Sequence, residues 1–312
     1  MLNRIFVPLE DTKTAEALLT QAFSFAKNLV AHVDVLRVVS VQRPRISNPL
    51  LTRWPIVGGI SNFPFIDQAS MPEIQSYIKR YQDEVEGARK EYREIYNKAC
   101  KDLGITKLHD DDEPIADKTT ASWIQHPPAA DGSGLVLKQA LVSDICMATR
   151  PGEEEDIWLS PVVHNILFNA AKPLILLPGE IHDQGFRHLP KHVAIAWNGS
   201  NESSHAVGAA MEFIKAAEKV TIFTYSSKKT NPSDADDIEK WLAFHGVATD
   251  KIVFDKLEVT SVGASLVAEV AERKIDLLVA GAYGHSRMRE FVLGGVTTYL
   301  LANCPVPLFM AH

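Results

Sequence analysis

Residues 275–308 read IDLLVAGAYGHSRMREFVLGGVTTYLLANCPVPL, and this stretch decides the fold that we expect for the chain. It opens with the apolar run 277–280, which has the length of a buried parallel strand and is too short for most helices. Gly281 and Gly284 follow at once. Because glycine has no Cβ, a glycine pair just past a strand lets the backbone turn sharply and approach a ligand closely.

A second glycine pair follows further along the same stretch. Gly294 and Gly295 precede Val296 and Thr297, where a short apolar helix is expected to begin. The amino end of a helix carries unpaired N–H groups and a partial positive charge, so this pattern is typical of a phosphate-binding site. Arg287 would add positive charge between the two pairs. The alternative interpretation is that the glycines only make tight turns.

The chain contains an internal repeat. Residues 4–27 pair without a gap with residues 192–215, and residues 144–173 pair with residues 276–305. Each copy opens with a strand, a polar turn and an amphipathic helix. Matching positions of the two copies are 188 residues apart near the start of each copy and 132 residues apart near its end. The first copy therefore carries 56 extra residues in its middle. The sequence therefore predicts two copies of one α/β unit.

The extra residues form two segments. Residues 43–70 are punctuated by proline and glycine and contain three aromatic residues, which predicts a long loop that covers something. Residues 72–103 predict a long helix, with Pro72 in its first turn and Gly104 just past its end. Its apolar residues form a heptad stripe. A helix packed along its own sheet with an overhanging end would explain this stripe, and so would a helix that pairs with a partner or a second copy.

The second copy alternates strands with helices. The expected strands are 192–197, 219–225, 251–258, 276–280 and 306–310, and the expected helices are 203–217, 234–244, 264–274 and 296–303. Such alternation builds a parallel sheet covered on both faces. Ligands bind at the carboxyl ends of such strands. Residues 197–200, residues 259–263 and the glycine loop are therefore expected to meet at one edge.

The register of the repeat predicts that the first copy has lost this site. Thr149 stands opposite Gly281, and residues 162–163, both valine, stand opposite residues 294–295. Residues 153–156 read EEED and stand opposite the loop. Four like charges would repel a triphosphate, and the valines would hold the backbone away.

The spacing G-x2-G-x9-G after a strand resembles the nucleotide loop of the universal stress protein family, where it holds the ribose and triphosphate of ATP. The tandem arrangement is similar to the two-domain members, and the resemblance covers essentially the whole chain outside the insert. It implies two Rossmann-like domains, 1–180 and 190–312, each a five-stranded parallel sheet flanked by helices. Family members usually have Ser or Thr after the third glycine and Asp at the end of the first strand, where this chain has Gly295 and Asn198.

Residues that match the family motif, or meet at the same edge, form the expected nucleotide site. They are Trp197, Asn198, Gly199, Ser200, Val262, Gly263, Gly281, Tyr283, Gly284, His285, Arg287, Gly294, Gly295, Val296 and Thr297. The leading hypothesis is a stress-response protein that binds ATP, with or without Mg²⁺, or a related adenine nucleotide in the second domain, and so changes its contacts with partners. No hydrolase motif is present, so any ATP hydrolysis is expected to be slow. The acidic run 109–113 is expected to be a solvated loop without metal.

An alternative hypothesis is a nucleotide-independent interaction module that binds a partner or an apolar ligand through the 43–70 loop and the long helix. Composition is compatible with both hypotheses. The chain has 312 residues, of which 46% are hydrophobic and 23% are charged, and these values predict two globular domains. A net charge of −7 argues against nucleic acid and anionic membranes as partners. Three cysteines without a paired pattern and no leader or membrane-length apolar run indicate a cytoplasmic protein with buried thiols.

Overall fold

The computed structural model describes residues 2–38, 71–109, 112–113, 115–125, 132–150, 160–178, 188–225, 233–254, 259–282 and 295–312. In parts of these ranges only the backbone is described, notably in most of 71–85 and in 251–254 and 259–261. The predicted loop 43–70, most of the linker 179–190 and the loop between Ala282 and Gly295 lie outside the described residues.

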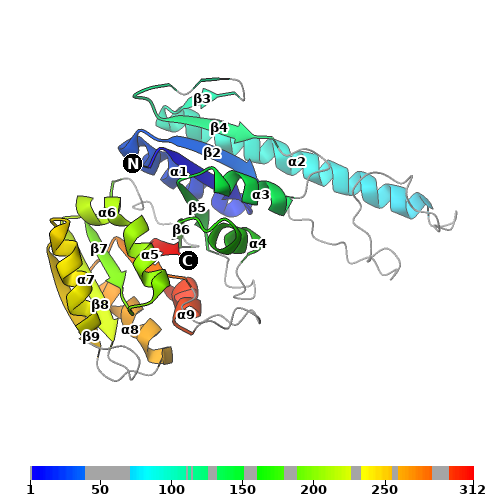
Figure 1. Ribbon diagram of the computed structural model, residues 1–312. Coiled ribbons are helices and arrows are strands. Elements are labelled where there is room, and N and C mark those ends of the chain that lie inside the picture. The colour runs from blue at the N-terminus through cyan, green and yellow to red at the C-terminus, as the bar shows by residue number, and fades with distance from the viewer. Residues whose placement is uncertain are drawn as a thin grey trace.

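The described strands and helices form two units (Figure 1). The first unit contains β1 (Arg4–Leu9), α1 (Thr12–Leu29), β2 (His32–Arg37), α2 (Met71–Leu103), β3 (Thr106–Leu108), β4 (Thr120–Ile124), α3 (Gly132–Leu141), β5 (Ile145–Thr149), α4 (Pro161–His164), the π-helical turn η3 (Asn165–Asn169) and β6 (Leu174–Leu177). The second unit contains β7 (His192–Ala196), α5 (Asn201–Ala209), α6 (Met211–Ala216), β8 (Lys219–Tyr225), α7 (Ser233–Phe244), β9 (Thr249–Phe254), α8 (Val259–Glu272), β10 (Leu277–Gly281), α9 (Gly295–Asn303) and β11 (Leu308–Ala311).

All of these strands belong to one sheet, in the order β3-β4-β2-β1-β5-β6-β11-β10-β7-β8-β9. The predicted Rossmann-like fold is confirmed: within each unit the strands are parallel, and the second unit has the five expected strands. In the first unit the five matching strands follow the mirrored order, and the short β3 adds a sixth at its edge. The units join through β6 and β11, which run antiparallel with Ile175 opposite Phe309.

Each face of the sheet carries one apolar core that runs through both units. One core lies under α1, the second half of α2, α5, α6 and α7, and the other lies under α3, α4, η3, α8 and α9. The central strands are buried on both sides, which is why β10 and β6 read as uninterrupted apolar runs. Cys100, Cys146 and Cys304 are free and buried, and burial raises the pKa of the Cys146 thiol, so this thiol is unreactive.

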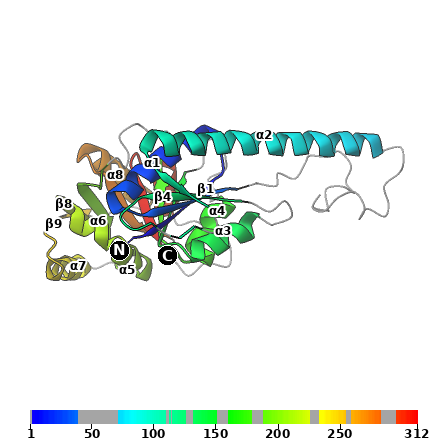
Figure 2. The same cartoon turned by 90° about the horizontal axis from the view of Figure 1, so that it is seen from above.

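The long helix α2 confirms the prediction for residues 72–103. Its second half packs on α1 through Tyr92, Tyr96 and Ala99, and the Tyr96 hydroxyl donates to the Ala121 carbonyl oxygen at 3.0 Å. The amino-terminal half continues past the sheet, as the two perpendicular views show (Figure 2). This arrangement matches a helix packed along its own sheet with an overhanging end.

Several expected boundaries in the second unit are wrong: β9 begins at Thr249 rather than at residue 251, and β11 begins at Leu308 rather than at residue 306. The helix expected at 203–217 is broken at Ala210 into α5 and α6, because Ala210 has ψ near 5° and leaves the helical conformation. The residues 259–263, expected as a loop after the third strand, form the first turns of α8. Thr260 and Ser261, residue types that often precede a helix, stand inside the helix here, so the pattern allowed a later start than the structure has.

Candidate nucleotide-binding site

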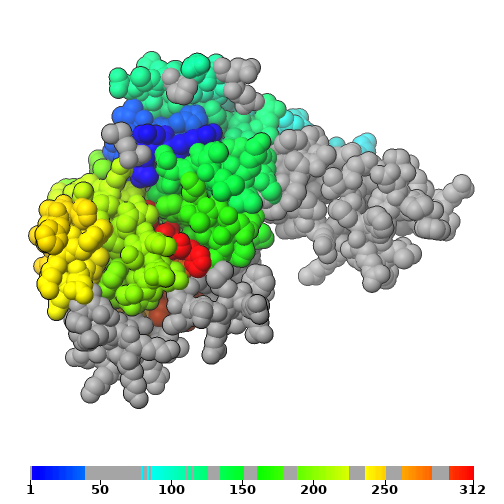
Figure 3. Space-filling view, viewed as in Figure 1, coloured from blue at the N-terminus to red at the C-terminus, as the bar shows by residue number. Residues whose placement is uncertain are grey.

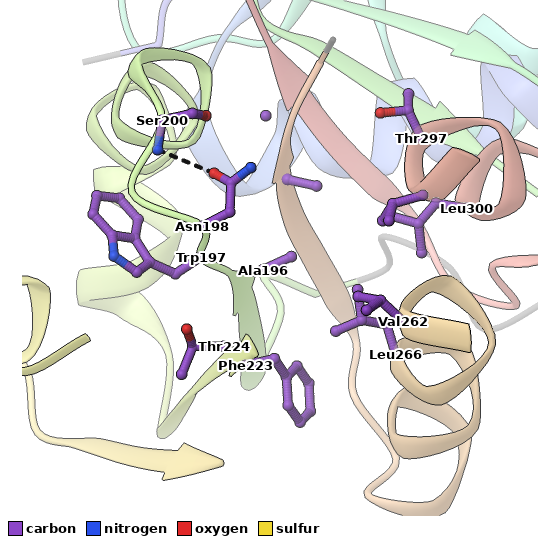
Figure 4. A pocket seen from close by; sticks show the side chains of 13 residues that line it. Ala196, Trp197, Asn198, Ser200, Phe223, Thr224, Val262, Leu266, Thr297 and Leu300 are labelled. Atoms are coloured by element: carbon purple, nitrogen blue, oxygen red, sulfur yellow. Dashed lines mark hydrogen bonds between the residues drawn. The ribbon is translucent and has the colours of Figure 1, made fainter. Parts of the chain in front are cut away.

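A pocket lies at the carboxyl ends of β7, β8 and β10, between the turn that follows β7 on one side and α8 and α9 on the other (Figure 4). Its lining residues are Ala196, Trp197, Asn198, Ser200, Phe223, Thr224, Val262, Leu266, Ala280, Gly281, Val296, Thr297 and Leu300. Its volume is about 90 Å³. Ligand pockets usually measure about 300 Å³ or more, so the space that the described residues enclose is smaller than a typical ligand pocket.

The turn after β7 forms one wall of this pocket. The Asn198 side-chain oxygen accepts a hydrogen bond from the Ser200 amide at 3.1 Å, and Gly199 adopts φ 70° between them. Ser200 then begins α5, because its hydroxyl oxygen accepts from the Ser203 amide at 3.2 Å. Since the Asn198 oxygen is used by the turn, the side-chain amide nitrogen is the group that it can offer to a ligand.

Gly281, at the end of β10, is required for packing against this turn. A Cβ at Gly281 would lie 2.5 Å from the Ser203 backbone nitrogen and 2.6 Å from the Glu202 carbonyl carbon. No side chain fits at that distance, so glycine lets β10 and the amino end of α5 touch. The glycine therefore sets the width of the pocket, and its expected contact with a nucleotide stays a prediction.

The opposite wall comes from two helices. Val262 and Leu266 of α8 face the pocket together with Leu300 of α9 (Figure 4). Gly263 does not line the pocket; a Cβ there would lie 2.8 Å from the Tyr299 Cβ, so this glycine lets α8 and α9 pack closely. Gly263 thus serves helix packing, and the nucleotide contact that the resemblance implies for it stays a prediction.

The amino end of α9 reaches the pocket through its first turn. Gly295 is exposed, while Val296 and Thr297 contribute to the lining and Thr297 is 8% exposed. The first backbone N–H groups of a helix have no partner within the helix and attract anions. All thirteen lining side chains are uncharged, so the polar groups that the described lining presents include helix amides, hydroxyls and the Asn198 side-chain amide.

Of the fifteen expected residues, seven line the pocket: Trp197, Asn198, Ser200, Val262, Gly281, Val296 and Thr297. Gly199, Gly263 and Gly295 are described but do not line it. Tyr283, Gly284, His285, Arg287 and Gly294 lie outside the described residues.

Sequence reasoning missed six lining residues: Ala196, Phe223, Thr224, Leu266, Ala280 and Leu300. Thr224 is the most informative because its side-chain oxygen is buried and has no hydrogen-bond partner within the described residues. Its place at the carboxyl end of an expected strand was the available signal. A buried hydroxyl without a partner is costly in a folded protein.

The matching region of the first unit is occupied by its own side chains. Val162 and Val163, which stand opposite Gly294 and Gly295 in the repeat, are buried in the core. Ser160 caps α4 by accepting from the Val163 amide and donates its hydroxyl to the Glu10 carboxylate at 3.0 Å. A carboxylate of the first unit therefore lies at the amino end of α4, which the repeat matches with α9, and the loss of the site in the first unit stays a prediction.

The described residues define a Rossmann-like protein with a pocket at the carboxyl edge of the sheet in its second unit. Residues 190–312 of this chain match the model of the Universal stress protein family. No match was found among curated proteins.

Two solved structures resemble the chain over its whole length. One is a universal stress protein from Archaeoglobus fulgidus DSM 4304, with 16% identity, a TM-score of 0.64, and coverage of 100% of this chain and 98% of the other. Another is a putative universal stress protein from Pseudomonas aeruginosa UCBPP-PA14, with 10% identity, a TM-score of 0.53, and coverage of 99% and 93%. At these identities the likeness establishes the fold.

Two other features bear on the expected partners. Among the described residues, no helix combines the length and the apolar character that crossing a bilayer would take. Nor do the described ranges contain a group of three or more His, Cys, Asp or Glu side chains arranged to hold a metal ion.

Proposed function

We propose that the second unit binds an adenine nucleotide, ATP in the first instance, and that the protein is a stress-response regulator whose partner contacts depend on nucleotide occupancy. The observation that carries this proposal is the pocket in which the first turn of α9 faces the Asn198–Ser200 turn across apolar walls. The apolar walls suit a base, and the helix amides suit phosphates.

The lining favours binding over catalysis. None of its thirteen side chains is an Asp, Glu, His, Lys or Cys that could act as a general base. A nucleotide held by amides and hydroxyls would be retained rather than turned over quickly, as a regulator needs. Mg²⁺, where it accompanies ATP, would be bound mainly by the phosphates.

Replacing Val296 by aspartate tests the proposal at the amino end of α9. A carboxylate in the first turn of a helix interacts favourably with the helix dipole, so the variant should fold. The same charge lies where phosphates are proposed, and repulsion at about 4 Å should weaken ATP binding by roughly tenfold or more. Adenosine, which lacks phosphates, should bind nearly as it binds the unchanged chain.

The control is Thr12→Asp, which adds the same charge to the first turn of α1 in the first unit. It should leave ATP binding unchanged. Equilibrium titration of ATP and adenosine with the three proteins provides the measurement. No saturable binding to the unchanged chain would overturn the proposal and leave the nucleotide-independent interaction module as the remaining hypothesis.

A further inference from the structure

A guanidinium from the first unit reaches into the second. Arg150 follows β5 and is 8% exposed. One of its terminal nitrogens donates to the Leu301 carbonyl oxygen at 2.9 Å and to the Leu300 carbonyl oxygen at 3.3 Å, and the other donates to the Cys304 carbonyl oxygen. A single side chain therefore donates to three backbone carbonyl groups at the end of α9 and just past it.

Leu300 and Leu301 lie in the last turn of α9 and Cys304 follows its last residue. Main-chain oxygens at this end of a helix lack some or all of their partners within the helix, although the Leu300 oxygen also accepts from the Cys304 amide at 3.0 Å. A cation at this end of a helix is stabilising because it opposes the negative end of the dipole. Within the described residues, the groups that accept hydrogen bonds from Arg150 are these backbone carbonyl oxygens. Burial lowers the pKa of the guanidinium, but arginine stays charged in proteins.

The opposite end of the same helix lines the pocket through Val296 and Thr297. Nine residues at about 1.5 Å per residue separate the two ends by roughly 14 Å. The helix is thus held at its carboxyl end by the first unit, while its amino end faces the proposed phosphates.

The first unit also supports the strand end that borders the pocket. The ring of Phe168 lies with its centroid 4.8 Å from that of His312. The Nδ1 atom of His312 lies 2.9 Å from the Ala282 carbonyl oxygen and donates to it, just past β10. In the space-filling view the carboxyl-terminal residues (red) lie against the green residues of the first unit (Figure 3). Residues of the first unit therefore contact α9 directly and contact the end of β10 through His312.

We propose that Arg150 is a positioning residue for phosphate binding in the second unit, acting through α9. The repeat places Arg150 opposite Ala282, so no arginine stands at the equivalent position of the second unit. The inference rests on the proposed nucleotide function, because it assigns the first unit a role in the affinity of that site. Its signature is selectivity: loss of Arg150 weakens ligands that carry phosphates and spares adenosine.

The size of the effect follows from charge and distance. A fixed positive charge about 14 Å from an anion, in a medium with an effective dielectric constant of about 20, changes affinity by roughly five- to tenfold for each charge. Arg150→Met removes the charge and the hydrogen bonds at similar length and should weaken ATP binding by at least that factor. Arg150→Lys keeps the charge but loses the planar fork, so a loss of about two- to threefold is expected.

The control variant is Arg89→Met, which removes an exposed positive charge from α2 of the same unit. It should leave ATP affinity unchanged. Dissociation constants for ATP and adenosine are measured for the full-length proteins, together with amide hydrogen exchange of residues 295–303 without ligand. Faster exchange in α9 and a selective loss of ATP affinity are the expected results for Arg150→Met.

Three results would overturn the inference while leaving the proposed function standing: a folded Arg150→Met variant that binds ATP as tightly as the unchanged chain, an equal loss for adenosine, or an equal loss in Arg89→Met. If Arg150→Met does not fold, Arg150→Lys decides, and unchanged ATP affinity in it overturns the inference. An unchanged chain that binds no nucleotide removes the proposed function and this inference with it.

Discussion

The rings of Phe25 and Phe213 stack with their centroids 5.5 Å apart, although Phe25 belongs to α1 of the first unit and Phe213 to α6 of the second. Phe213 also packs edge-on against Phe309 of β11, with centroids 5.7 Å apart. Both phenylalanines of the stack are buried completely or nearly so. The two repeats are therefore joined by a common core as well as by the β6–β11 pairing.

We predict that the chain unfolds in one cooperative transition, because the core around Phe213 belongs to both units. Phe213→Ala should lower the free energy of unfolding by about 3–5 kcal/mol, as expected for a large side chain removed from a core. Chemical denaturation followed by tryptophan fluorescence and by far-UV circular dichroism provides the measurement. Two separated transitions in the unchanged chain would contradict a shared core.

A methyl group at Gly281 should disturb the turn that forms the pocket wall. Gly281→Ala places a Cβ against the backbone of Glu202 and Ser203, and relief of this clash should cost about 1–3 kcal/mol. Gly208→Ala is the matched control, since a Cβ there has no heavy atom within 4 Å and alanine suits a helix interior better by about 1 kcal/mol. Thermal unfolding of both variants tests the pair, and equal stabilities would be inconsistent with the close approach.

Thr224 and Thr221 lie on the same strand and differ in their partners. The Thr221 hydroxyl bonds to the Nε2 atom of His192 at 2.9 Å, whereas the buried Thr224 hydroxyl has no partner within the described residues. Thr224→Val should therefore stabilise the free protein by about 1 kcal/mol, and Thr221→Val should destabilise it by about 1–2 kcal/mol. Denaturant midpoints compare the two, and a loss of stability in Thr224→Val would show that its hydroxyl is satisfied.

Asp34 should contribute to stability at neutral pH and lose that contribution in acid. Burial alone would raise the pKa of Asp34, but hydrogen bonds from His32 and Arg4 outweigh burial, so the pKa is lowered. The folded state then binds its proton less readily than the unfolded chain, whose Asp pKa is about 3.9. The stabilisation is complete above that value and disappears as pH falls through the lower folded pKa.

Asp34→Asn should accordingly cost about 1–2 kcal/mol at pH 7, a figure reduced by the partial exposure of Arg4. The difference from the unchanged chain should shrink below about pH 4. Asp250→Asn is the control, because Asp250 pairs with Lys219 at an exposed site, and it should leave stability unchanged within error. A deficit in Asp34→Asn that persists at low pH would refute the electrostatic explanation.

The strands and helices could be predicted from the sequence because short stretches of sequence carry the signals for them. Apolar runs such as 277–280 have the length and burial of parallel strands, and Pro72 and Gly104 bracketed a helix whose ends lie within one residue of the prediction. The break at Ala210 had no such marker. The short strand β3 and the joining of both units in one sheet depend on contacts between distant segments, which periodicity does not report.

The residues of the site could be predicted from the sequence where glycines and strand ends mark them. They could not be predicted where the packing of helices brings a residue to the pocket. Asn198, Ser200, Val296 and Thr297 line the pocket as expected. Leu300 was missed because an apolar residue in a short helix reads as ordinary core. Arg150 lies 150 residues from Leu300 along the chain, and the repeat register pairs it with alanine, so only three-dimensional contact reveals its position on α9.

The antiparallel pairing of β6 with β11 joins two halves of a sheet that belong to one polypeptide. In an assembly of two identical subunits every substitution would appear twice, and dissociation would separate the halves on dilution. Here a substitution in one half is not repeated in the other, and the covalent chain keeps the halves together at any concentration. One unit can therefore become a structural support for the other, and each molecule always contains one copy of each unit.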